Sequence, residues 1–356
     1  MRSLRGKAAS VTFERVTKVF GPVVAVREVS FTIAPGQLVT LLGPSGCGKT
    51  TTLRLIAGLE MPTAGRILIG EDDVTTVPAT ERDVSMVFQS YALFPHMTVL
   101  ENVAYGLNVS GVPKAEARAR AEEGLALVGL EGYGRRLPSE LSGGQQQRVA
   151  VARALVLEPE VLLFDEPLSN LDAKLRRRVR EEIRELQQKL GLTSVYVTHD
   201  QGEALAVSDH IIVMRNAEIA QEGGPRELYE QPLDRFVADF IGDANLVEAE
   251  VTAVNGALAT VRIGPLTREL PRHGLEPGPA RVALRPETIL LLPEPRADAI
   301  AGEILKATYL GSHMEYTVGT PLGELFVVDP HVDRTLPPGA AVSVLPGARG
   351  LTLVRD

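Results

Sequence analysis

Two short stretches of the sequence carry residue types that suit the binding and cleavage of a phosphate chain. The first, GPSGCGKTT at 43–51, fills the pattern G-x-x-x-x-G-K-[ST]. Glycines let successive backbone N–H groups point at phosphate oxygens, and the start of a following helix adds a positive dipole end. Lys49 would reach the terminal phosphates, and the Thr50 hydroxyl would bind Mg²⁺. The residues expected to line a nucleotide here are Gly43, Pro44, Ser45, Gly46, Cys47, Gly48, Lys49, Thr50 and Thr51.

The second stretch, VLLFDEP at 161–167, places two adjacent acids at the end of an apolar run. Asp165 would hold the metal and its water shell, and Glu166 would polarise the attacking water. Alone, such a pair could equally cap the next helix. Downstream of a complete phosphate loop, it indicates hydrolysis of a nucleotide.

These residues need elements that position them, and the hydrophobic pattern predicts an α/β core. GQLVTLLG predicts a strand ending in glycine, followed by a helix from about Lys49 to Leu59. That context argues against a glycine turn that merely contains GKT. VLLFDEP and TSVYVTHD (193–200) are nearly continuous apolar runs, typical of parallel strands buried on both faces. Alternation predicts two further strands in VTFERVTKVF and VREVSFTI.

Pattern changes along the chain predict two domains. We expect an α/β domain over 9–242, with a helical subdomain inserted at about 90–158. From 243 to 356 many short, Gly- and Pro-punctuated strands predict a small all-β domain of OB-like barrel type. The basic run KLRRRVR at 174–180 precedes EEIREL, which favours a solvated helix with ion pairs four residues apart.

Composition excludes several classes of protein. With 356 residues, 44% hydrophobic and 23% charged, the chain is long enough for two globular domains. A formal net charge of −8 argues against a nucleic-acid partner. A single cysteine, Cys47, excludes an internal disulfide and favours a reducing compartment. No run of eighteen apolar residues and no signal peptide is evident, so we expect a cytoplasmic protein.

A second glycine-rich segment, LSGGQ at 141–145, identifies the family. With the phosphate loop and the acidic strand in one chain, it resembles the signature of the ATP-binding subunits of ABC transporters, over essentially the whole sequence. The resemblance implies ATP and Mg²⁺ as ligands and a head-to-tail homodimer. In that dimer Ser142, Gly143, Gly144 and Gln145 of one copy would close over ATP held by the other.

Other positions take their roles from the same resemblance. Phe20 would stack on adenine, with a core aromatic as the alternative. Gln89 would meet Mg²⁺ and the attacking water, and His199 would contact the γ-phosphate. Asp172 lies in the loop that crosses the dimer interface. The segment YALFPHMTV at 91–99 would receive a short helix of a membrane subunit, or else form the subdomain core.

The chain carries one phosphate loop and one signature, no membrane helices and no long coiled coil between them. This pattern favours a homodimeric ATPase on the inner face of the cell membrane, serving separate permease subunits and an extracytoplasmic binding protein. FVADFIGDAN and ALRPETI resemble the tail of importers for sugars, sulfate, iron and polyamines. That tail would sense a regulator or simply clamp the dimer.

The tail also leads to an expectation about the transported substrate. We expect sulfate-type oxoanion import, with a maltose-type sugar, polyamine or iron importer as the alternative. A soluble ATP-dependent regulator without transport is an alternative of another class.

Overall fold

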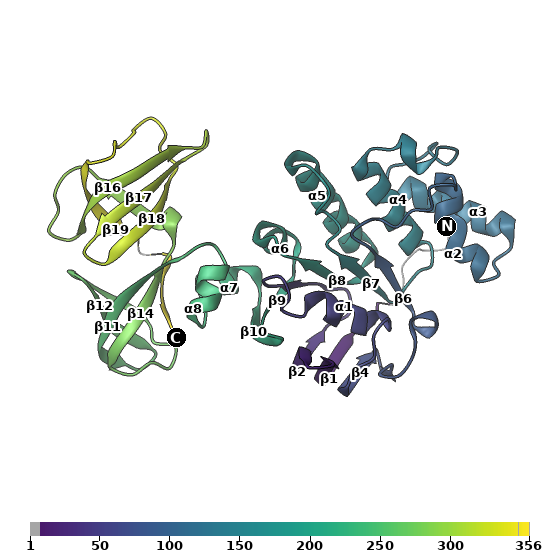
Figure 1. Ribbon diagram of the computed structural model, residues 1–356, viewed down its shortest axis with the longest axis horizontal. Coiled ribbons are helices and arrows are strands. Elements are labelled where there is room, and N and C mark those ends of the chain that lie inside the picture. The colour runs from purple at the N-terminus through teal and green to yellow at the C-terminus, as the bar shows by residue number, and fades with distance from the viewer. Residues whose placement is uncertain (1–7, 348, 356) are drawn as a thin grey trace. The chain divides into compact units, whose positions relative to one another are not determined.

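The computed structural model describes residues 8–347 and 349–355, and its contacts divide the chain into two compact units between Pro225 and Arg226 (Figure 1). The elements of the first unit are β1 (Val11–Phe20), β2 (Val23–Ile33), β3 (Leu38–Leu42), α1 (Lys49–Ala57), β4 (Ala64–Ile69), β5 (Asp72–Asp73), η1 (Ala79–Glu81), β6 (Val84–Val87), α2 (Val99–Val109), α3 (Lys114–Leu127), η2 (Pro138–Glu140), α4 (Gly143–Leu155), β7 (Val161–Asp165), α5 (Ala173–Leu190), β8 (Thr193–Thr198), α6 (Gln201–Val207), β9 (His210–Arg215) and β10 (Glu218–Gly223).

A six-stranded sheet with the order β10-β9-β3-β8-β7-β6 forms the centre of this unit. All its neighbours pair in parallel except β10 with β9. β8 is buried along its whole length, as its nearly continuous apolar run predicts. β3, expected only as a strand, is also fully buried. Leu42 pairs with Thr198 and Asp165 with Val197, so the strands end together at one carboxyl edge. The α/β core is therefore confirmed.

A second sheet, β2-β1-β4-β5, is antiparallel and completes the core around α1. Phe13 and Phe31 stack at 4.5 Å on paired strands of this sheet. They share one buried cluster with Leu53 and Ile56 of α1 and with Val195 of β8. α1 is thus held rigidly by its apolar face, and its first turn carries the phosphate loop.

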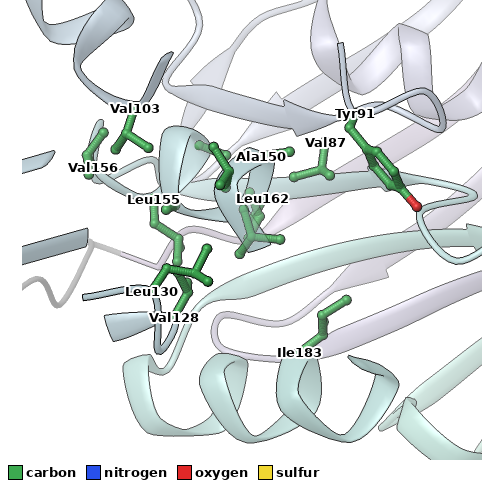
Figure 2. Close-up of a cluster of buried hydrophobic side chains, with 14 of the residues drawn as sticks. Val87, Tyr91, Val103, Val128, Leu130, Ala150, Leu155, Val156, Leu162 and Ile183 are labelled. Carbon is green, nitrogen blue, oxygen red and sulfur yellow. The ribbon is translucent and has the colours of Figure 1, made fainter. Parts of the chain in front are cut away.

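The helical subdomain packs α2, α3 and α4 against the other side of the core. Figure 2 shows this buried cluster, in which Val103 of α2 and Leu155 of α4 lie with Leu162 of β7 and Ile183 of α5. α2 begins with a capping box in which Thr98 and Glu101 satisfy each other's backbone N–H groups. The cluster fixes α4, whose first residues belong to the LSGGQ segment, to the strand that ends at Asp165.

The second unit is β-rich. Its strands form two five-stranded antiparallel sheets, β13-β12-β11-β14-β20 and β15-β19-β16-β17-β18, around one shared apolar cluster. Its elements are α7 (Pro225–Glu230), α8 (Arg235–Phe240), β11 (Asn245–Asn255), β12 (Leu258–Ile263), β13 (Leu266–Pro271), β14 (Gly278–Leu284), η3 (Pro286–Thr288), β15 (Ile289–Leu292), β16 (Ile300–Tyr309), β17 (Met314–Thr320), β18 (Gly323–Asp329), β19 (Ala341–Pro346) and β20 (Leu351–Val354).

By contact, the two helices before the strands go with this second unit, whereas the sequence placed the boundary at 242/243. Ala238 of α8 packs with Ala283 and Val354 of the sheet. The buried guanidinium of Arg285 donates to the carbonyl oxygens of Tyr229 (3.1 Å) and Ala238 (2.9 Å). A helical periodicity could not show which neighbour these helices pack on. No helix among the described residues is long and apolar enough to cross a membrane.

Candidate nucleotide site

The phosphate loop wraps the space between β3 and α1. Gly46 and Gly48 have φ angles of 80° and 108°, which favour glycine. A Cβ on Gly48 would lie 2.4 Å from the Ala25 carbonyl oxygen, and one on Gly43 would lie 2.3 Å from that of Met214. The crest of the loop at 44–46 is exposed. The glycine spacing therefore serves a tight turn that leaves its outer side open.

The loop lysine lies inside this turn. Lys49 is 6% exposed, and its Nζ donates to the carbonyl oxygens of Gly43 (2.7 Å) and Pro44 (2.9 Å). Phosphate oxygens would compete with these two acceptors for the ammonium. Cys47 is also buried, and burial raises the pKa of its thiol, although Lys49 opposes the shift. A protonated, buried thiol fits the interpretation of Cys47 as a small packing residue.

Two of the three expected metal ligands, Thr50 and Asp165, meet at the carboxyl edge of the sheet. The Thr50 hydroxyl lies 3.4 Å from Oδ1 of Asp165 and donates to it. Burial raises the pKa of Asp165; Arg54 opposes the shift and Glu166 adds to it. A half-buried carboxylate beside a hydroxyl and a second acid is a set of hard oxygen donors that a divalent cation would stabilise. These residues fit the Mg²⁺ expected from the sequence.

The second acid lies beside the expected histidine. Glu166 Oε2 is 3.2 Å from Nδ1 of His199, and their side chains are 23% and 61% exposed. Glu166 has a left-handed backbone with a φ of 44°, and its N–H donates to the Val197 carbonyl at 3.0 Å. The strained turn aims the carboxylate away from the strand, toward the loop after β8. An acceptor and an imidazole side by side can orient one water.

Two further expected residues lie around this pair. Gln89 is exposed just beyond β6, and its carbonyl accepts from Nδ2 of Asn170 at 3.0 Å. Asp172 is the N-cap of α5 and accepts from the Leu175 N–H at 3.0 Å. The segment 168–172 therefore touches the Gln89 loop and starts the helix that follows.

The LSGGQ segment forms a capped helix start. Gln145 Oε1 accepts from the Ser142 N–H at 2.9 Å, and Ser142 Oγ accepts from the Gln145 N–H at 3.4 Å. The Gln145 side chain is thus used within the cap rather than projecting outward. Leu171 and Leu175 lie against Gly143 and Gly144, respectively. In the described part of the chain, no hydrogen bond or ion pair joins this segment to the loop at 43–51.

The expected adenine-stacking residue is at the surface. Phe20 ends β1 and is 43% exposed, which excludes the core alternative. Lys18 Nζ lies 4.6 Å from its ring centroid. Stacking on adenine stays a prediction.

Part of the segment 91–99 is buried in the subdomain core, and part of it lies at the surface. Tyr91 is buried in the subdomain cluster (Figure 2). Phe94 instead pairs with the part-exposed ring of Tyr105 at 4.6 Å. Arg153 donates to the carbonyl oxygens of Tyr91 and Ala92 at 2.9 and 2.7 Å, which fixes the segment to α4.

Sequence reasoning missed the residues behind the Glu166–His199 pair. Ser169, Arg176, Asp200 and Glu203 line a small cavity with this pair. They come from three separate stretches of the chain, and no motif or spacing connects them. Only the helix in KLRRRVR was expected, and Arg176 was assigned to solvent.

Comparison with known proteins follows this geometry. A family model described as ABC transporter matches residues 26–169, and one described as TOBE domain matches 282–353. The chain is 65% identical over 345 residues to an Fe(3+) ions import ATP-binding protein of Rhizobium meliloti (strain 1021), covering 97% of this chain and 98% of that protein. The protein of the same name from Brucella abortus (strain 2308) is 63% identical over 350 residues, with 98% and 99% covered.

Solved structures give the same result for the fold. A dimeric ATP-binding cassette in a post-hydrolysis state, bound to ADP and Pi, matches with a TM-score of 0.54 and 34% identity. The match covers 61% of this chain and 99% of that one. A second dimeric structure, of a bacterial ABC transporter cassette, has a TM-score of 0.55 at the same identity and coverage.

Proposed function

The chain belongs to the ATP-binding import subunits of the ABC transporter family, and from that premise we propose that its ATPase activity drives the import of ferric iron. The single observation that carries the cargo is the near full-length identity, 63–65%, to proteins named for Fe(3+) import. A relative from Vibrio cholerae serotype O1 has the same name at 51% identity. This corrects the sulfate expectation: iron was one of its alternatives, and the relatives favour it.

We infer that the cargo passes through the separate permease subunits, so the residue patterns of this chain carry little information about it. The tail stretches FVADFIGDAN and ALRPETI resemble the tails of importers with different cargoes, so they favour import without distinguishing the cargo. The sugar and polyamine alternatives have no observation in their favour. A soluble regulator is disfavoured, because a relative aligned over 98% of its length is named for import.

For the site, we infer that the loop at 43–51 holds the phosphates of ATP. Thr50, Asp165 and Gln89 would hold Mg²⁺, which when bound would neutralise charge on the transferred phosphoryl group. Glu166 would accept hydrogen bonding from the attacking water, and His199 would hold that water and the γ-phosphate in line. The meeting of both pairs at one sheet edge supports these roles.

A second copy of the chain would complete the site. The capped start of α4 is a helix N-terminus with exposed Ser142, well suited to an anionic phosphate, yet it makes no bond to the chain's own loop in the described residues. The matching solved cassettes are dimers. Ser142, Gly143 and Gly144 would therefore contact ATP on the partner.

Import requires further proteins besides the ATPase subunit. We propose that permease subunits dock on the exposed part of the segment 91–99, and that an extracytoplasmic binding protein delivers the iron. The chain would then sit peripherally on the inner face of the membrane. The TOBE domain would add contacts within the dimer or sense a regulator.

Uptake by cells tests the cargo. Cells whose own copy carries Lys49→Ala should lose uptake of radiolabelled ferric iron while keeping uptake of sulfate, maltose and putrescine. Lys306→Ala, at an exposed lysine of β16, is the control and should keep all four. Loss of sulfate uptake instead would restore the oxoanion assignment. Unchanged uptake of all four would contradict the proposed import of iron.

A further inference from the structure

An ionic cluster lies behind the Glu166–His199 pair, and none of the roles above uses it. Arg176 projects from the first turns of α5, and Asp200 and Glu203 lie at the start of α6. The cluster lines the same small cavity as Glu166 and His199.

Glu203 holds the residues on both sides of His199. It is 4% exposed, and its Oε2 accepts from the Thr198 hydroxyl at 2.8 Å and from the Tyr196 hydroxyl at 3.1 Å. Its own N–H donates to Oδ1 of Asp200 at 2.8 Å. The Asp200 N–H in turn donates to Thr198 Oγ1 at 3.0 Å. The backbone flanking His199 is therefore fixed through one buried carboxylate.

Arg176 connects this loop to a different segment. Its Nε lies 3.7 Å from Oε1 of Glu203, and its Nη1 lies 3.6 Å from Oδ2 of Asp200. Its Nη2 donates to the Leu171 carbonyl at 3.1 Å, and its N–H donates to the Asp172 carbonyl at 2.8 Å. One guanidinium thus joins the segment 168–172 to the loop that carries His199.

The segment 168–172 has contacts of its own with the other site residues. The Ser169 hydroxyl donates to the Glu166 carbonyl at 3.0 Å, and Asn170 donates to the Gln89 carbonyl at 3.0 Å. Leu171 lies against Gly143 of the LSGGQ segment. A shift of this segment would therefore disturb contacts to Glu166, Gln89 and the LSGGQ segment.

Charge explains why the guanidinium is needed. Burial raises the pKa of Glu203, and Asp200 adds to the shift, while Thr198, Tyr196 and Arg176 oppose it. Two carboxylates a few residues apart repel each other unless a cation faces both. Arg176 faces both, so its loss would remove this cation and its link from the segment 168–172 to the His199 loop. Arg180 of α5 would still donate to the Gly202 carbonyl of α6 at 3.3 Å.

We propose that Arg176 is a positioning residue for ATP hydrolysis, which couples the segment 168–172 to the loop of His199. Contact of this segment with the second copy would then be transmitted through Arg176 to the loop that holds His199 3.2 Å from Glu166. The inference rests on the proposed roles of Glu166 and His199. It predicts an effect on turnover and none on the affinity for ATP, because the phosphate loop is not touched.

Steady-state hydrolysis by the purified full-length chain tests this coupling. Arg176→Met should lower kcat about tenfold or more while KM for ATP stays within about twofold, and Arg176→Lys should restore part of the loss. Arg177→Met is the matched control, because Arg177 is exposed on the same helix and its ion pair among the described residues is with Glu181 at 3.3 Å. That variant should keep the wild-type kcat.

A double-mutant cycle with Glu203→Gln separates coupling from general damage. If the two side chains act as one link, the double variant should be little slower than either single variant. Additive losses, an unchanged kcat in Arg176→Met, or parallel loss of ATP binding would each overturn the proposal. If Arg176→Met does not fold, as seen by thermal denaturation, Arg176→Lys decides. A lowered kcat that Glu203→Gln lowers little further supports the link, and additive losses overturn it. Turnover by Glu166→Gln would instead refute the proposed catalytic site.

Discussion

At the scale of single residues, the site depends on backbone positions that few residue types favour. Gly48 faces the Ala25 carbonyl too closely for any side chain, and Glu166 takes a left-handed φ of 44° at the end of β7. A non-glycine residue holds such a conformation only where its surroundings over-determine it. Here the Glu166 N–H and C=O are both bonded, to Val197 and Ser169. The backbone thus fixes the carboxylate beside His199.

Replacing Glu166 with Gln tests the role of its charge. The amide keeps the shape but is a poor proton acceptor, so hydrolysis should fall by about 10²-fold or more. ATP binding should remain, because the phosphates are held by the loop at 43–51. Phosphate release and equilibrium ATP binding measure the two effects, and Glu131→Gln, at an exposed acid, is the control. Wild-type phosphate release by Glu166→Gln would contradict the assignment.

The sequence predicted local motifs well and missed contacts between distant residues. The residues of the phosphate loop are consecutive in the sequence, so a single motif predicts the whole loop. The run at 174–180 does form a helix with ion pairs four residues apart, such as Arg177 with Glu181. Arg176 differs because its side chain faces α6, and Glu203 has no fixed sequence distance from it. The contact of Arg176 with α6 depends on how the two helices pack, and the periodicity of α5 alone does not predict that packing.

At the scale of elements, the carboxyl edge of the parallel sheet gathers the chemistry. β3, β7 and β8 were expected as strands, β7 and β8 as buried ones, and their pairing brings Asp165 to Thr50. β6 was not expected, because a four-residue strand carries too little pattern to be distinguished from a loop. The order of the strands could not be predicted from the sequence either, because it depends on pairing between residues far apart in the chain.

One acid, Asp209, links strand β3 to helix α5 and makes the stability of the fold depend on pH. Asp209 Oδ2 accepts from the Leu38 N–H of β3 at 2.8 Å and from Arg184 Nη1 of α5 at 2.9 Å. Burial alone would raise the pKa of Asp209, but these bonds outweigh it and lower the pKa. The ionised carboxylate therefore stabilises the fold above its ordinary pKa, and this contribution is lost as pH falls through the lowered value.

Asp209→Asn should remove that contribution. At pH 7 the free energy of unfolding should fall by about 1 kcal/mol, because the group is partly exposed and the bonds are charge-assisted. Near pH 3 the difference from wild type should shrink. Urea unfolding at both pH values measures this, with Asp333→Asn at an exposed acid as the control. An equal difference at both pH values would contradict the linkage.

At the scale of the whole molecule, the proposed function gives each chain two separate halves of a nucleotide site. The phosphate loop lies in the core cluster around α1, and the LSGGQ helix lies in the subdomain cluster of Figure 2. In a two-fold dimer, the loop of each copy can face the LSGGQ segment of the other, which gives two equivalent sites. The second glycine-rich element then has a function that one phosphate loop alone cannot supply.

Mixing two inactive variants tests this composite site most directly. Lys49→Ala damages a chain's own loop, and Ser142→Arg damages the site that the chain completes on its partner. Each variant alone should hydrolyse ATP at background rate, whereas an equal mixture should recover up to about a quarter of wild-type activity, since half of the dimers then have one intact site. A mixture as inactive as its components, with mixed dimers demonstrated by differential tags, would contradict the account.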